Sequence, residues 1–304
     1  MQNSIEISVI IPTHNRAKTI TACVESVLSQ SYQVNEIIII DDDSTDDTNK
    51  QLNKFDDNII LLKTEKRSGA QTARNIGITA AKSKWIAFLD SDDEWLPNKI
   101  EKQISALKTV NYNPMTVVHS DCYIKNIESD DIKLWELDKI GGANVYRQLL
   151  AKPGTFFPSI LTSKNALTKI NFLDENVPSY HEWDTAIRLA KYCKFIHIQE
   201  PLFIYNIHEN TISRNSNVSV EGYQYIINKF KNDIKKLCGE DVFTSHLIIN
   251  SVLAFNNNQN IFGRTILKQV PNNLLKKLIL FSLSYLNIKP IFFNRIKQFF
   301  LRIK

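Results

Sequence analysis

Residues 5–90 alternate between short apolar runs and segments in which apolar residues recur at helical spacing. The apolar runs occupy residues 5–12, 36–41, 58–63 and 85–90. After the first run, Ile20, Val24 and Val27 fall on one face of a predicted helix, and a further helix is predicted over residues 70–82. Strands that alternate with helices in this way are typical of an α/β protein with a mostly parallel sheet.

Two of the predicted strands end in clusters of acidic residues. The first cluster is Asp41–Asp43, and the second contains Asp90, Asp92 and Asp93. Because the carboxyl ends of parallel strands meet at one edge of a sheet, where ligands bind in open sheets, both clusters are expected there. Side chains alternate along a strand, so Asp90 and Asp92 can point the same way and repel each other unless a cation lies between them. Mg²⁺ or Mn²⁺, held by one or two carboxylates and by substrate phosphates, meets that need.

The acidic residues also have a simpler interpretation as helix caps. Asp92 or Asp93 can cap a helix that Pro97 opens. In the same way, one of the acids in Asp41–Asp43 can cap a helix that begins near Ser44–Thr48, where the helix dipole favours negative charge. The residues alone leave ligand binding and capping open for both clusters.

Composition places the chain among ordinary soluble proteins. It has 304 residues, of which 43% are hydrophobic and 23% are charged, which is enough for one large α/β domain and an appendage. The four cysteines form no zinc-binding spacing, which favours reduced thiols in a cytosolic setting. No basic stretch precedes the first apolar run, so no signal peptide is expected. The first strand is not followed by the G-x-G-x-x-G pattern, which argues against a dinucleotide-dependent oxidoreductase.

Charge is unevenly distributed along the chain. Residues 221–304 carry 13 Lys or Arg and 4 Asp or Glu, whereas residues 1–220 carry 24 and 28. The segment 271–304 contains no acid and combines basic residues with a helical apolar face that includes Phe292 and Phe299. This combination predicts contact with an anionic membrane surface. The alternative is a helical appendage that packs on the rest of the chain or forms a homodimer. No recognition motif accompanies the charge, so no nucleic-acid partner is expected.

Five sequence motifs follow one another along the chain. They are Val9–Arg16, Ile40–Asp46, Gly69–Gly77, Phe88–Asp93 and His181–Ala190. In this order and at this spacing they resemble the motifs of the family 2 glycosyltransferases, whose nucleotide-sugar-binding fold is called GT-A. The resemblance covers about residues 5–215. It implies an α/β fold of the GT-A type, with a central, mostly parallel sheet and a C-terminal helical appendage.

The resemblance also implies how the chain is divided. Residues 1–220 are expected to form the GT-A catalytic domain. Within it, residues 1–95 would be the nucleotide-binding half and residues 96–220 the acceptor-side half. A basic helical C-terminal region would follow over residues 221–304.

On the donor side, the resemblance assigns nucleotide binding to residues at or near the ends of the predicted strands. These residues are Pro12, Thr13, Asn15, Asp42, Arg74, Asp90 and Ser91. The resemblance further implies that Asp92, Asp90 and His208 bind Mn²⁺ or Mg²⁺. The family usually has glycine where Asp43 stands, so the local turn is expected to differ. For Arg74 the alternative is a surface ion pair, and for His208 it is an ordinary structural role.

On the acceptor side, the fifth motif supplies the candidate general base. Glu182 matches the position of the base, where many relatives have aspartate. Asp184 is the second candidate, although it can also form an ordinary i,i+4 pair with Arg188. Trp183 is a candidate for stacking on a sugar, with buried packing as the alternative. Arg214 is expected in a loop that closes over the nucleotide.

Together the motifs imply an inverting, non-processive glycosyltransferase. An acceptor hydroxyl would attack the anomeric carbon while the nucleoside diphosphate leaves, and one general base suffices for this single displacement. The expected donor is a UDP-sugar, by family frequency, and the expected acceptor is a glycan or a lipid-linked glycan of cell-surface polysaccharide synthesis. The enzyme would be a hexosyl- or N-acetylhexosaminyltransferase, cytoplasmic and peripheral on the inner face of the cell membrane.

Two other functions fit parts of the same pattern. A nucleotidyltransferase also combines an α/β sheet, carboxylates and Mg²⁺, but it usually has a glycine-rich phosphate loop after the first strand, whereas Pro12–Arg16 contains no glycine. A non-catalytic, membrane-associated scaffold with the same fold would have no need of acids at Asp42, Asp92 and Glu182. The residues do not determine which sugar is moved, onto which acceptor or in which linkage.

Overall fold

The structure divides the chain into two compact units. The computed structural model describes residues 5–207, 216–271, 277 and 282. The first unit contains Met1–Asn176 and His181–His208, and the second contains Val177–Tyr180 and Glu209–Lys304, as far as these residues are described. The segment Val177–Tyr180 therefore packs with helices that follow much later in the sequence, although the residues on either side of it belong to the first unit.

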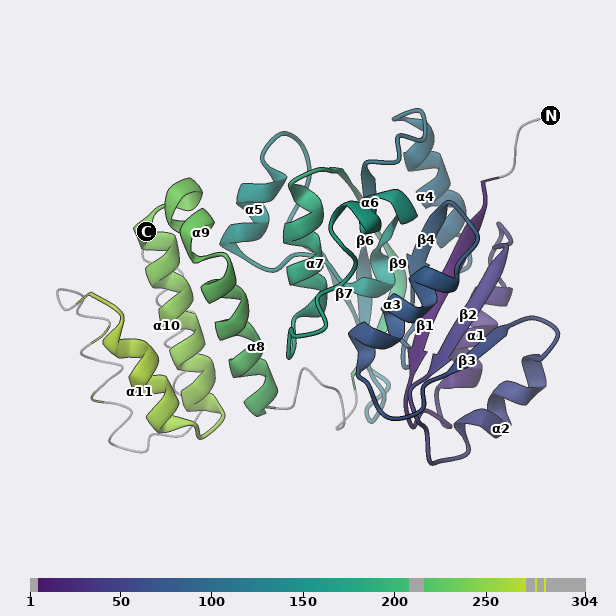
Figure 1. Ribbon diagram of the computed structural model, residues 1–304, viewed down its shortest axis with the longest axis horizontal. Coiled ribbons are helices and arrows are strands. Elements are labelled where there is room, and N and C mark those ends of the chain that lie inside the picture. Colours follow the sequence, from purple (N-terminus) through teal and green to yellow (C-terminus); the bar gives the residue numbers. More distant parts are fainter. Residues whose placement is uncertain (1–4, 208–215, 272–276, 278–281, 283–304) are drawn as a thin grey trace. The chain divides into compact units, whose positions relative to one another are not determined.

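The described residues of the first unit are built around a nine-stranded mixed sheet (Figure 1). The strands are Ile7–Thr13 (β1), Glu36–Asp41 (β2), Ile60–Lys63 (β3), Trp85–Phe88 (β4), Glu94–Trp95 (β5), Thr116–Asn126 (β6), Ile132–Trp135 (β7), Leu161–Ser163 (β8) and Lys194–Ile207 (β9). Their order across the sheet is β3-β2-β1-β4-β8-β6-β9-β5, and β7 pairs with β6. The alternation of strands and helices predicted for the N-terminal part is therefore confirmed.

The direction of the strands brings the two acidic clusters to one edge of the sheet. Strands β1 to β4 are paired in parallel, so their carboxyl ends lie together. β8 is antiparallel to both β4 and β6, and β6 is parallel to β9, so β6 and β9 also end at this edge. Asp41–Asp43 follow β2 and Asp90–Asp93 follow β4, as the sequence predicted.

Seven α-helices belong to the described residues of the first unit. They are Ile20–Leu28 (α1), Thr48–Leu52 (α2), Ala70–Ala80 (α3), Lys99–Lys108 (α4), Val145–Ala151 (α5), Lys164–Lys169 (α6) and His181–Ala190 (α7), with short 3-10 turns at Asn53–Phe55 and Phe157–Ser159. The approach of α3 to β1 and β2 depends on Gly77, because a Cβ atom there would lie 2.7 Å from side-chain atoms of both Ile10 and Ile40. Strands β1, β2 and β4 are buried in the core, whereas β3 lies at the edge of the sheet and is partly exposed.

Several boundaries differ from the prediction: the strands predicted at 58–63 and 85–90 are shorter, and the helix predicted over 70–82 ends at Ala80. β1 includes Pro12, which is in register with Ile40 of β2, and the strand ends one residue later. The helix expected to open at Pro97 begins instead at Lys99, because the preceding residues Glu94–Trp95 form β5, which pairs with β9. Asn98 occupies the N-cap position of that helix, so the interpretation of Asp92 or Asp93 as its cap is wrong.

The second unit is helical. Its described helices are Ser216–Lys229 (α8), Lys231–Cys238 (α9), Glu240–Asn256 (α10) and Asn260–Lys268 (α11). Helix α8 lies very close to the segment Val177–Tyr180, because a Cβ atom at Gly222 would lie 2.7 Å from Ser179 N and 2.8 Å from Ser179 O. The buried Tyr223 hydroxyl, one residue further along α8, is hydrogen-bonded to His246 Nδ1 at 2.7 Å.

Two predictions about the C-terminal region remain open. Helix α8 spans residue 220, where the catalytic domain was predicted to end, and that division of the chain stays a prediction. The basic segment 271–304, predicted to contact a membrane, lies outside the described residues except at positions 271, 277 and 282. Among the described helices, none is long and apolar enough to span a bilayer.

Candidate active site

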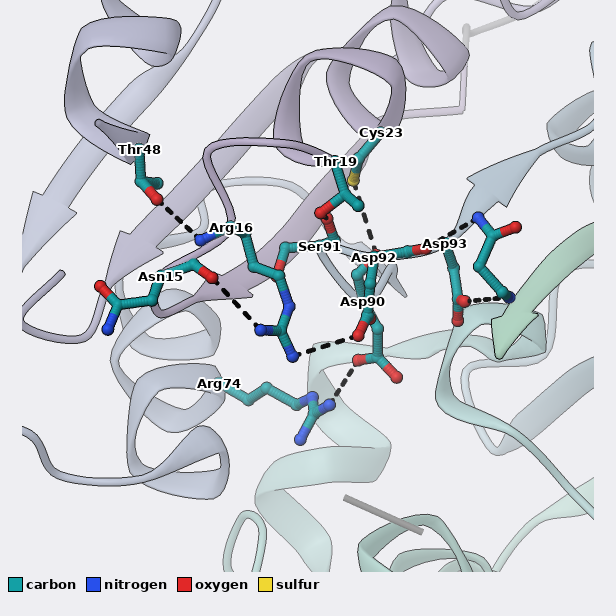
Figure 2. A network of polar contacts seen from close by, with 11 residues as sticks. Asn15, Arg16, Thr19, Cys23, Thr48, Arg74, Asp90, Ser91, Asp92 and Asp93 are labelled. Carbon is teal, nitrogen blue, oxygen red and sulfur yellow. Dashed lines mark hydrogen bonds and ion pairs between the residues drawn. The ribbon is translucent and has the colours of Figure 1, made fainter. Parts of the chain in front are cut away.

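The acidic loop Asp90–Asp93 follows β4 and is held in place by helix α1 (Figure 2). The Thr19 hydroxyl donates to the carbonyl oxygen of Ser91 at 2.9 Å, and the Cys23 thiol lies 3.6 Å from the carbonyl oxygen of Asp90. These contacts satisfy main-chain oxygens of the loop. The carboxylates of Asp90 and Asp92 are therefore left to interact with side chains from other elements.

Two arginines from different elements contact these carboxylates. Arg16, in the loop after β1, donates to Asp92 Oδ2 at 3.2 Å, and Arg74, on α3, donates to Asp90 Oδ1 at 2.5 Å. Figure 2 shows both guanidinium groups reaching the same part of the loop. The side chains of Asp90 and Asp92 remain 27% and 18% exposed, so the pair is open to a ligand.

Arg74 is built into the protein rather than placed on its surface. Its side chain is only 5% exposed, and its guanidinium carbon lies 4.1 Å from the centre of the Phe157 ring. A further hydrogen bond joins Arg74 Nη1 to Gln71 Oε1 at 2.9 Å. The alternative of a surface ion pair is therefore wrong, because the cation is buried against an aromatic ring and fixed beside Asp90.

Asp93 ties the acidic loop to the end of β9. Its Oδ1 atom accepts from the main-chain N–H of Asn206 at 2.9 Å, and the Asn206 side chain donates to the carbonyl oxygen of Asp92 at 2.8 Å. Burial, followed by the charges of Asp92 and Asp90, raises the pKa of Asp93 well above its ordinary value. Asp93 therefore serves to join two strands that come from distant parts of the sequence.

The pKa of Asp90 is set by opposing influences. Burial raises it, the Arg74 cation lowers it, and the neighbouring Asp92 carboxylate raises it again, with a net upward shift from the ordinary value. Two acids this close disfavour each other's charge unless positive charge is nearby. In the described structure Arg16 and Arg74 supply that charge.

The acids after β2 are used mainly by the protein itself. The Asp42 carboxylate accepts hydrogen bonds from the hydroxyl of Thr64 at 2.9 Å, from the main-chain N–H of Ser68 at 2.8 Å and from that of Gly69 at 2.7 Å. Burial opposes these bonds, but together they lower the pKa of Asp42. Asp41 accepts from the main-chain N–H of Ser44 at 3.1 Å and so supports the turn after β2, but Asp47 occupies the N-cap position of α2, so the interpretation of Asp41–Asp43 as its cap is wrong.

The turn beside Asp42 keeps a backbone conformation that favours glycine. Asp43 has a φ angle of 63°, in the left-handed region where aspartate is among the better tolerated residues. Asn15 also has a positive φ of 53°, and its side-chain oxygen accepts from the main-chain N–H of Thr45 at 2.8 Å. Asn15 thus stabilises the loop after β2 from the loop after β1.

The first strand ends in a polar group without a partner. Pro12 and Thr13 are buried at the end of β1, and the carbonyl oxygen of Thr13 accepts from the main-chain N–H of Asp42 at 2.8 Å. The Thr13 hydroxyl oxygen is buried and has no hydrogen-bond partner in the described structure. Buried polar groups are normally paired, so this hydroxyl is suited to receive a ligand.

Glu182 lies in the first turn of α7 and is partly buried. Its pKa is raised to about 7, chiefly by burial; the charge of Asp90 also raises the pKa, whereas the main-chain N–H of Glu182 and the Arg74 cation lower it. A carboxyl group with a pKa near neutrality is suited to accept a proton under physiological conditions. Its dependence on Asp90 and Arg74 places Glu182 within electrostatic reach of the acidic loop.

The other candidates of the fifth motif are buried by the fold. Asp184 is fully buried, and one of its oxygens lies 3.6 Å from Arg188 Nη1, the i,i+4 arrangement predicted as its alternative role. Trp183 is buried as well, and its indole N–H donates to the carbonyl oxygen of Leu149 at 2.7 Å. In this structure Trp183 offers no open face to a sugar, so packing accounts for it. His208 and Arg214 lie outside the described residues.

The carboxylates of the acidic loop can bind a divalent cation only if oxygen atoms of a bound ligand complete its coordination. Among the described residues, no three His, Cys, Asp or Glu side chains gather closely enough to cage a metal. Asp90 and Asp92 do offer carboxylate oxygens at one edge of the sheet, and a carboxylate can accept several contacts beside one arginine. Two carboxylates completed by phosphate oxygens form the kind of site that Mg²⁺ and Mn²⁺ occupy.

The structure also identifies residues that received no role from the sequence. Arg16 was present in the first motif, but its contact with Asp92 joins residues 76 positions apart. Asn206 and Phe157 carry no chemical signature of their own, and they become recognisable only once β9 and the turn at Phe157–Ser159 are placed beside β4. The motif supplied a signal for Arg16, whereas no local signal existed for the other two.

The fold of this chain is found in proteins of known structure. Solved structures of S. aureus TarS have the same fold. The structure of TarS residues 1–349 in complex with UDP matches with a TM-score of 0.59 and 14% identity, covering 92% of this chain and 90% of that one. The complex with UDP-GlcNAc matches with a TM-score of 0.60 and 16% identity, covering 92% and 79%.

Sequence comparison identifies the family. Residues 8–160 match the model described as glycosyl transferase family 2, and the chain belongs to this family. An Escherichia coli relative, UDP-Glc:alpha-D-GlcNAc-diphosphoundecaprenol beta-1,3-glucosyltransferase WfgD, is 32% identical over 214 residues, which cover 69% of this chain and 80% of the relative. The putative teichuronic acid biosynthesis glycosyltransferase TuaG of Bacillus subtilis is 45% identical over 101 residues, covering 32% and 40%. The predictions of the GT-A fold and of glycosyltransferase activity are therefore confirmed.

Proposed function

We propose that the protein is an inverting glycosyltransferase that moves one sugar from a UDP-sugar to a hydroxyl group of a lipid-linked glycan. The name of the relative WfgD describes transfer from UDP-Glc to GlcNAc-diphosphoundecaprenol, and the chain covers 80% of that enzyme. The structurally similar TarS has been solved with UDP and with UDP-GlcNAc. These names support the classes of donor and acceptor, and they leave open which hexose or N-acetylhexosamine is moved.

The nucleotide is proposed to bind at the ends of β1, β2 and β4. The unpaired Thr13 hydroxyl supplies a polar group at the end of β1. Asp42 contributes by holding the segment from Thr64 to Gly69 in place, because four donors of that segment converge on its carboxylate. Arg16 and Arg74 place two positive charges beside the acidic loop, where a diphosphate would lie.

Asp90 and Asp92 are the residues proposed to hold Mn²⁺ or Mg²⁺ together with the diphosphate. A divalent cation bound there supplies the positive charge that stabilises a diphosphate leaving group. Arg16, whose side chain is 23% exposed, can turn from Asp92 toward the phosphates as the nucleotide binds, whereas the buried Arg74 stays beside Asp90. His208 remains a proposed third ligand and lies outside the described residues.

Glu182 is proposed to act as the general base. The acceptor hydroxyl oxygen forms a bond to the anomeric carbon, the bond from that carbon to the diphosphate breaks, and the hydroxyl proton passes to the Glu182 carboxylate. A pKa of about 7 matches this task, because the group is partly ionised at neutral pH and is still basic enough to hold the proton.

The observation that carries this function is the acidic loop after β4, where Asp90 and Asp92 lie at the carboxyl edge of the parallel strands and are paired with Arg74 and Arg16. The base candidate Glu182 comes from α7, and the raised pKa of its carboxyl group supports this role. A single displacement requires a base on one side of the reacting carbon and a leaving-group site on the other, and Glu182 and the acidic loop are proposed for these two places.

The test compares Glu182→Gln with Asp184→Asn. Glu182→Gln preserves size and hydrogen bonding but cannot take a proton, so turnover should fall by at least about 100-fold, while UDP-sugar affinity stays near that of the wild type. Asp184→Asn should lower the thermal midpoint through the loss of a buried ion pair and leave the turnover of the folded fraction largely intact. If Glu182→Gln turned over normally and Asp184→Asn were inactive while folded, the two roles would have to be exchanged.

Membrane attachment through residues 271–304 stays part of the proposal. The segment carries seven Lys or Arg and no Asp or Glu, and each basic residue near an anionic surface contributes about 1 kcal/mol at low salt. Full-length protein should float with anionic liposomes and be released by high salt. A protein that stays at the bottom of the gradient with anionic lipid present would exclude this attachment, and sizing chromatography of the same sample would then report whether a homodimer forms instead.

A further inference from the structure

One tryptophan of this protein is exposed, although the other three are buried. Trp85, Trp95 and Trp183 are at most 3% exposed, whereas Trp135 on β7 is 42% exposed. The large apolar surface of an indole is normally covered, and an open face next to a functional site is typical of a ligand contact. Trp135 therefore needs an explanation beyond the packing that accounts for the other three.

The open ring is held by other aromatic side chains. Phe156 packs edge-on against Trp135, with ring centres 5.3 Å apart, and also contacts Tyr205 at 5.2 Å and Phe203 at 6.2 Å. Such an edge-to-face contact restrains the Trp135 ring, while 42% of the residue stays exposed. Trp135 is thus a supported platform on the β6–β7 hairpin.

A short chain of contacts connects this platform to the proposed reaction site. Phe156 is followed by Phe157, whose ring packs under the Arg74 guanidinium at 4.1 Å. Arg74 in turn is paired with Asp90. Trp135 is therefore connected to the acidic loop through two adjacent phenylalanines and one arginine.

The order of the strands decides on which side of the acidic loop Trp135 lies. Asp42 follows β2, which is two strands from β4 on one side, and β6 is two strands from β4 on the other side. β7 is paired with β6, with Trp135 in register with Cys122. A ligand with its nucleotide near Asp42 and its diphosphate near Asp90 would therefore have Trp135 on the far side, where an acceptor must enter.

We propose that Trp135 is the stacking platform for the acceptor sugar, an inference that rests on the proposed glycosyl transfer. The C–H groups on one face of a pyranose ring are apolar and slightly positive, and they complement the negative face of an aromatic ring. Sites for small molecules typically combine such aromatic walls with a few polar groups that fix orientation. In this enzyme the wall orients the acceptor, and Glu182 takes its proton.

A lipid contact is the competing use of the same hairpin. Ile132 and Leu134, which alternate with Trp135 along β7, are 52% and 51% exposed. The turn between β6 and β7 carries the acids Glu128, Asp130 and Asp131, which disfavour an anionic membrane surface. The charge of the hairpin therefore favours the sugar over the bilayer.

The first experiment uses Trp135 as its own reporter. Because the other three tryptophans are buried, acrylamide should quench mainly the fluorescence of Trp135 in the wild-type protein, and Trp135→Phe should abolish most of this quenching. We expect GlcNAc-diphosphate carrying a short alkyl chain to protect the fluorescence from acrylamide. The same alkyl diphosphate without the sugar should give no protection, and protection by that sugar-free compound would assign the surface to lipid and overturn the proposal.

The second experiment separates acceptor binding from the reaction itself. Trp135→Ala should raise the KM for the acceptor by about tenfold and leave the KM for the UDP-sugar unchanged, whereas Trp135→Phe should retain most of the acceptor affinity. Leu134→Ala removes an equally exposed side chain from the neighbouring position and is the matched control. An unchanged acceptor KM in Trp135→Ala, with turnover by the wild type under the same conditions, would disprove the platform and leave the proposed function standing.

Failure of the proposed function would be seen in a different assay, the one that measures use of the UDP-sugar donor. If the wild-type protein neither bound nor consumed UDP-sugars, the assignment of the donor would be wrong. The donor assay detects this failure independently of the platform, because Trp135 variants are expected to bind and consume UDP-sugars like the wild type. Donor consumption without acceptor, measured as UDP release, provides this reference for every variant.

Discussion

The guanidinium group of Arg74 is shared between two functions, because it donates to Asp90 at 2.5 Å and also lowers the pKa of Glu182. Asp90 acts on Glu182 in the opposite direction. The proposed metal-binding carboxylate and the proposed base are therefore linked through one cation that comes from α3. A change at Arg74 is expected to affect the base even though the two residues lie on different helices.

Arg74→Met should move the pH dependence of turnover to higher pH. The Arg74 cation lowers the pKa of Glu182, which stands at about 7, so its removal raises that pKa. A base must be ionised to act, and activity is therefore lost as pH falls through its pKa. The acidic limb of the kcat profile, measured at saturating UDP-sugar, should shift upward in the variant.

Arg16→Met is the matched control for this experiment. Arg16 pairs with Asp92 in the same loop, but it does not contribute to the pKa of Glu182. The acidic limb of the kcat profile of Arg16→Met should coincide with that of the wild type, even if the affinity of the variant for UDP-sugar falls. Equal shifts of the acidic limb in Arg74→Met and Arg16→Met would mean that the pH dependence of kcat reflects the overall charge of the site rather than the ionisation of Glu182.

Asp92→Asn should abolish metal-dependent transfer. The variant keeps the size of the side chain but removes the charge proposed to hold the cation, so turnover should fall by at least about 100-fold. Binding of Mn²⁺ in the presence of UDP, followed by electron paramagnetic resonance, should weaken in parallel. Asp130→Asn, at an exposed carboxylate that pairs with Lys125, should behave like the wild type. Normal Mn²⁺ binding in Asp92→Asn would remove Asp92 from the metal site.

His119 should make the protein less stable in mild acid. The ring is buried and stacked on His197, with centres 4.4 Å apart. Burial, followed by the neighbouring His197, lowers the pKa of His119 from 6.5 to about 3. Below its unfolded pKa only the unfolded chain takes up this proton, so the native state loses about 2 kcal/mol of unfolding free energy between about pH 7.5 and pH 5.

The variant His119→Gln tests this contribution. Glutamine does not titrate, so the loss of stability between neutral and mildly acidic pH should be smaller by about the same amount. Denaturant midpoints at about pH 7.5 provide the baseline, because the histidine is neutral there in both states. A variant whose stability declines with acid as steeply as the wild type would show that other groups are responsible.

The sequence predicted the elements that local patterns determine. β2 was predicted at Glu36–Asp41 and is found there, because a run of isoleucines between polar residues allows little choice of boundary. Asp90 and Asp92 were predicted as site residues because they follow a predicted strand, and Glu182 was predicted from its place in the fifth motif. The long-range contacts could not be predicted: the bond from Asn206 to Asp93 joins residues 113 positions apart and depends on how β5 pairs with β9. The stacking of Arg74 on Phe157 has the same origin.

Gly222→Ala should disturb the segment that precedes the base. The added Cβ atom would lie 2.7 Å from the main-chain nitrogen of Ser179, and backbone cannot yield as a side chain can. Overpacking of this kind costs about 1–3 kcal/mol. We expect a lower thermal midpoint and a reduced kcat, because Ser179 lies three residues before Glu182.

Gly263→Ala is the control within the same helical unit. The three atoms nearest to its Cβ atom would all belong to the ring of Phe255, at 2.5–3.0 Å, and none of them to Val177–Tyr180. It should lower the thermal midpoint without reducing the kcat of the folded enzyme. If both variants lost kcat in proportion to their stability, the effect of Gly222 would be general and not directed at the base.

The exchange of Val177–Tyr180 between the two units limits how this enzyme can be recombined with its relatives. A chimaera joined between β9 and α8 would place a foreign α8 beside the native segment Val177–Tyr180, and the strain would fall on the residues just before α7. A successful graft would have to carry its own version of this segment together with its helices. The C-terminal region and the residues before the base are therefore expected to be inherited as one module, even though some thirty residues of chain separate them.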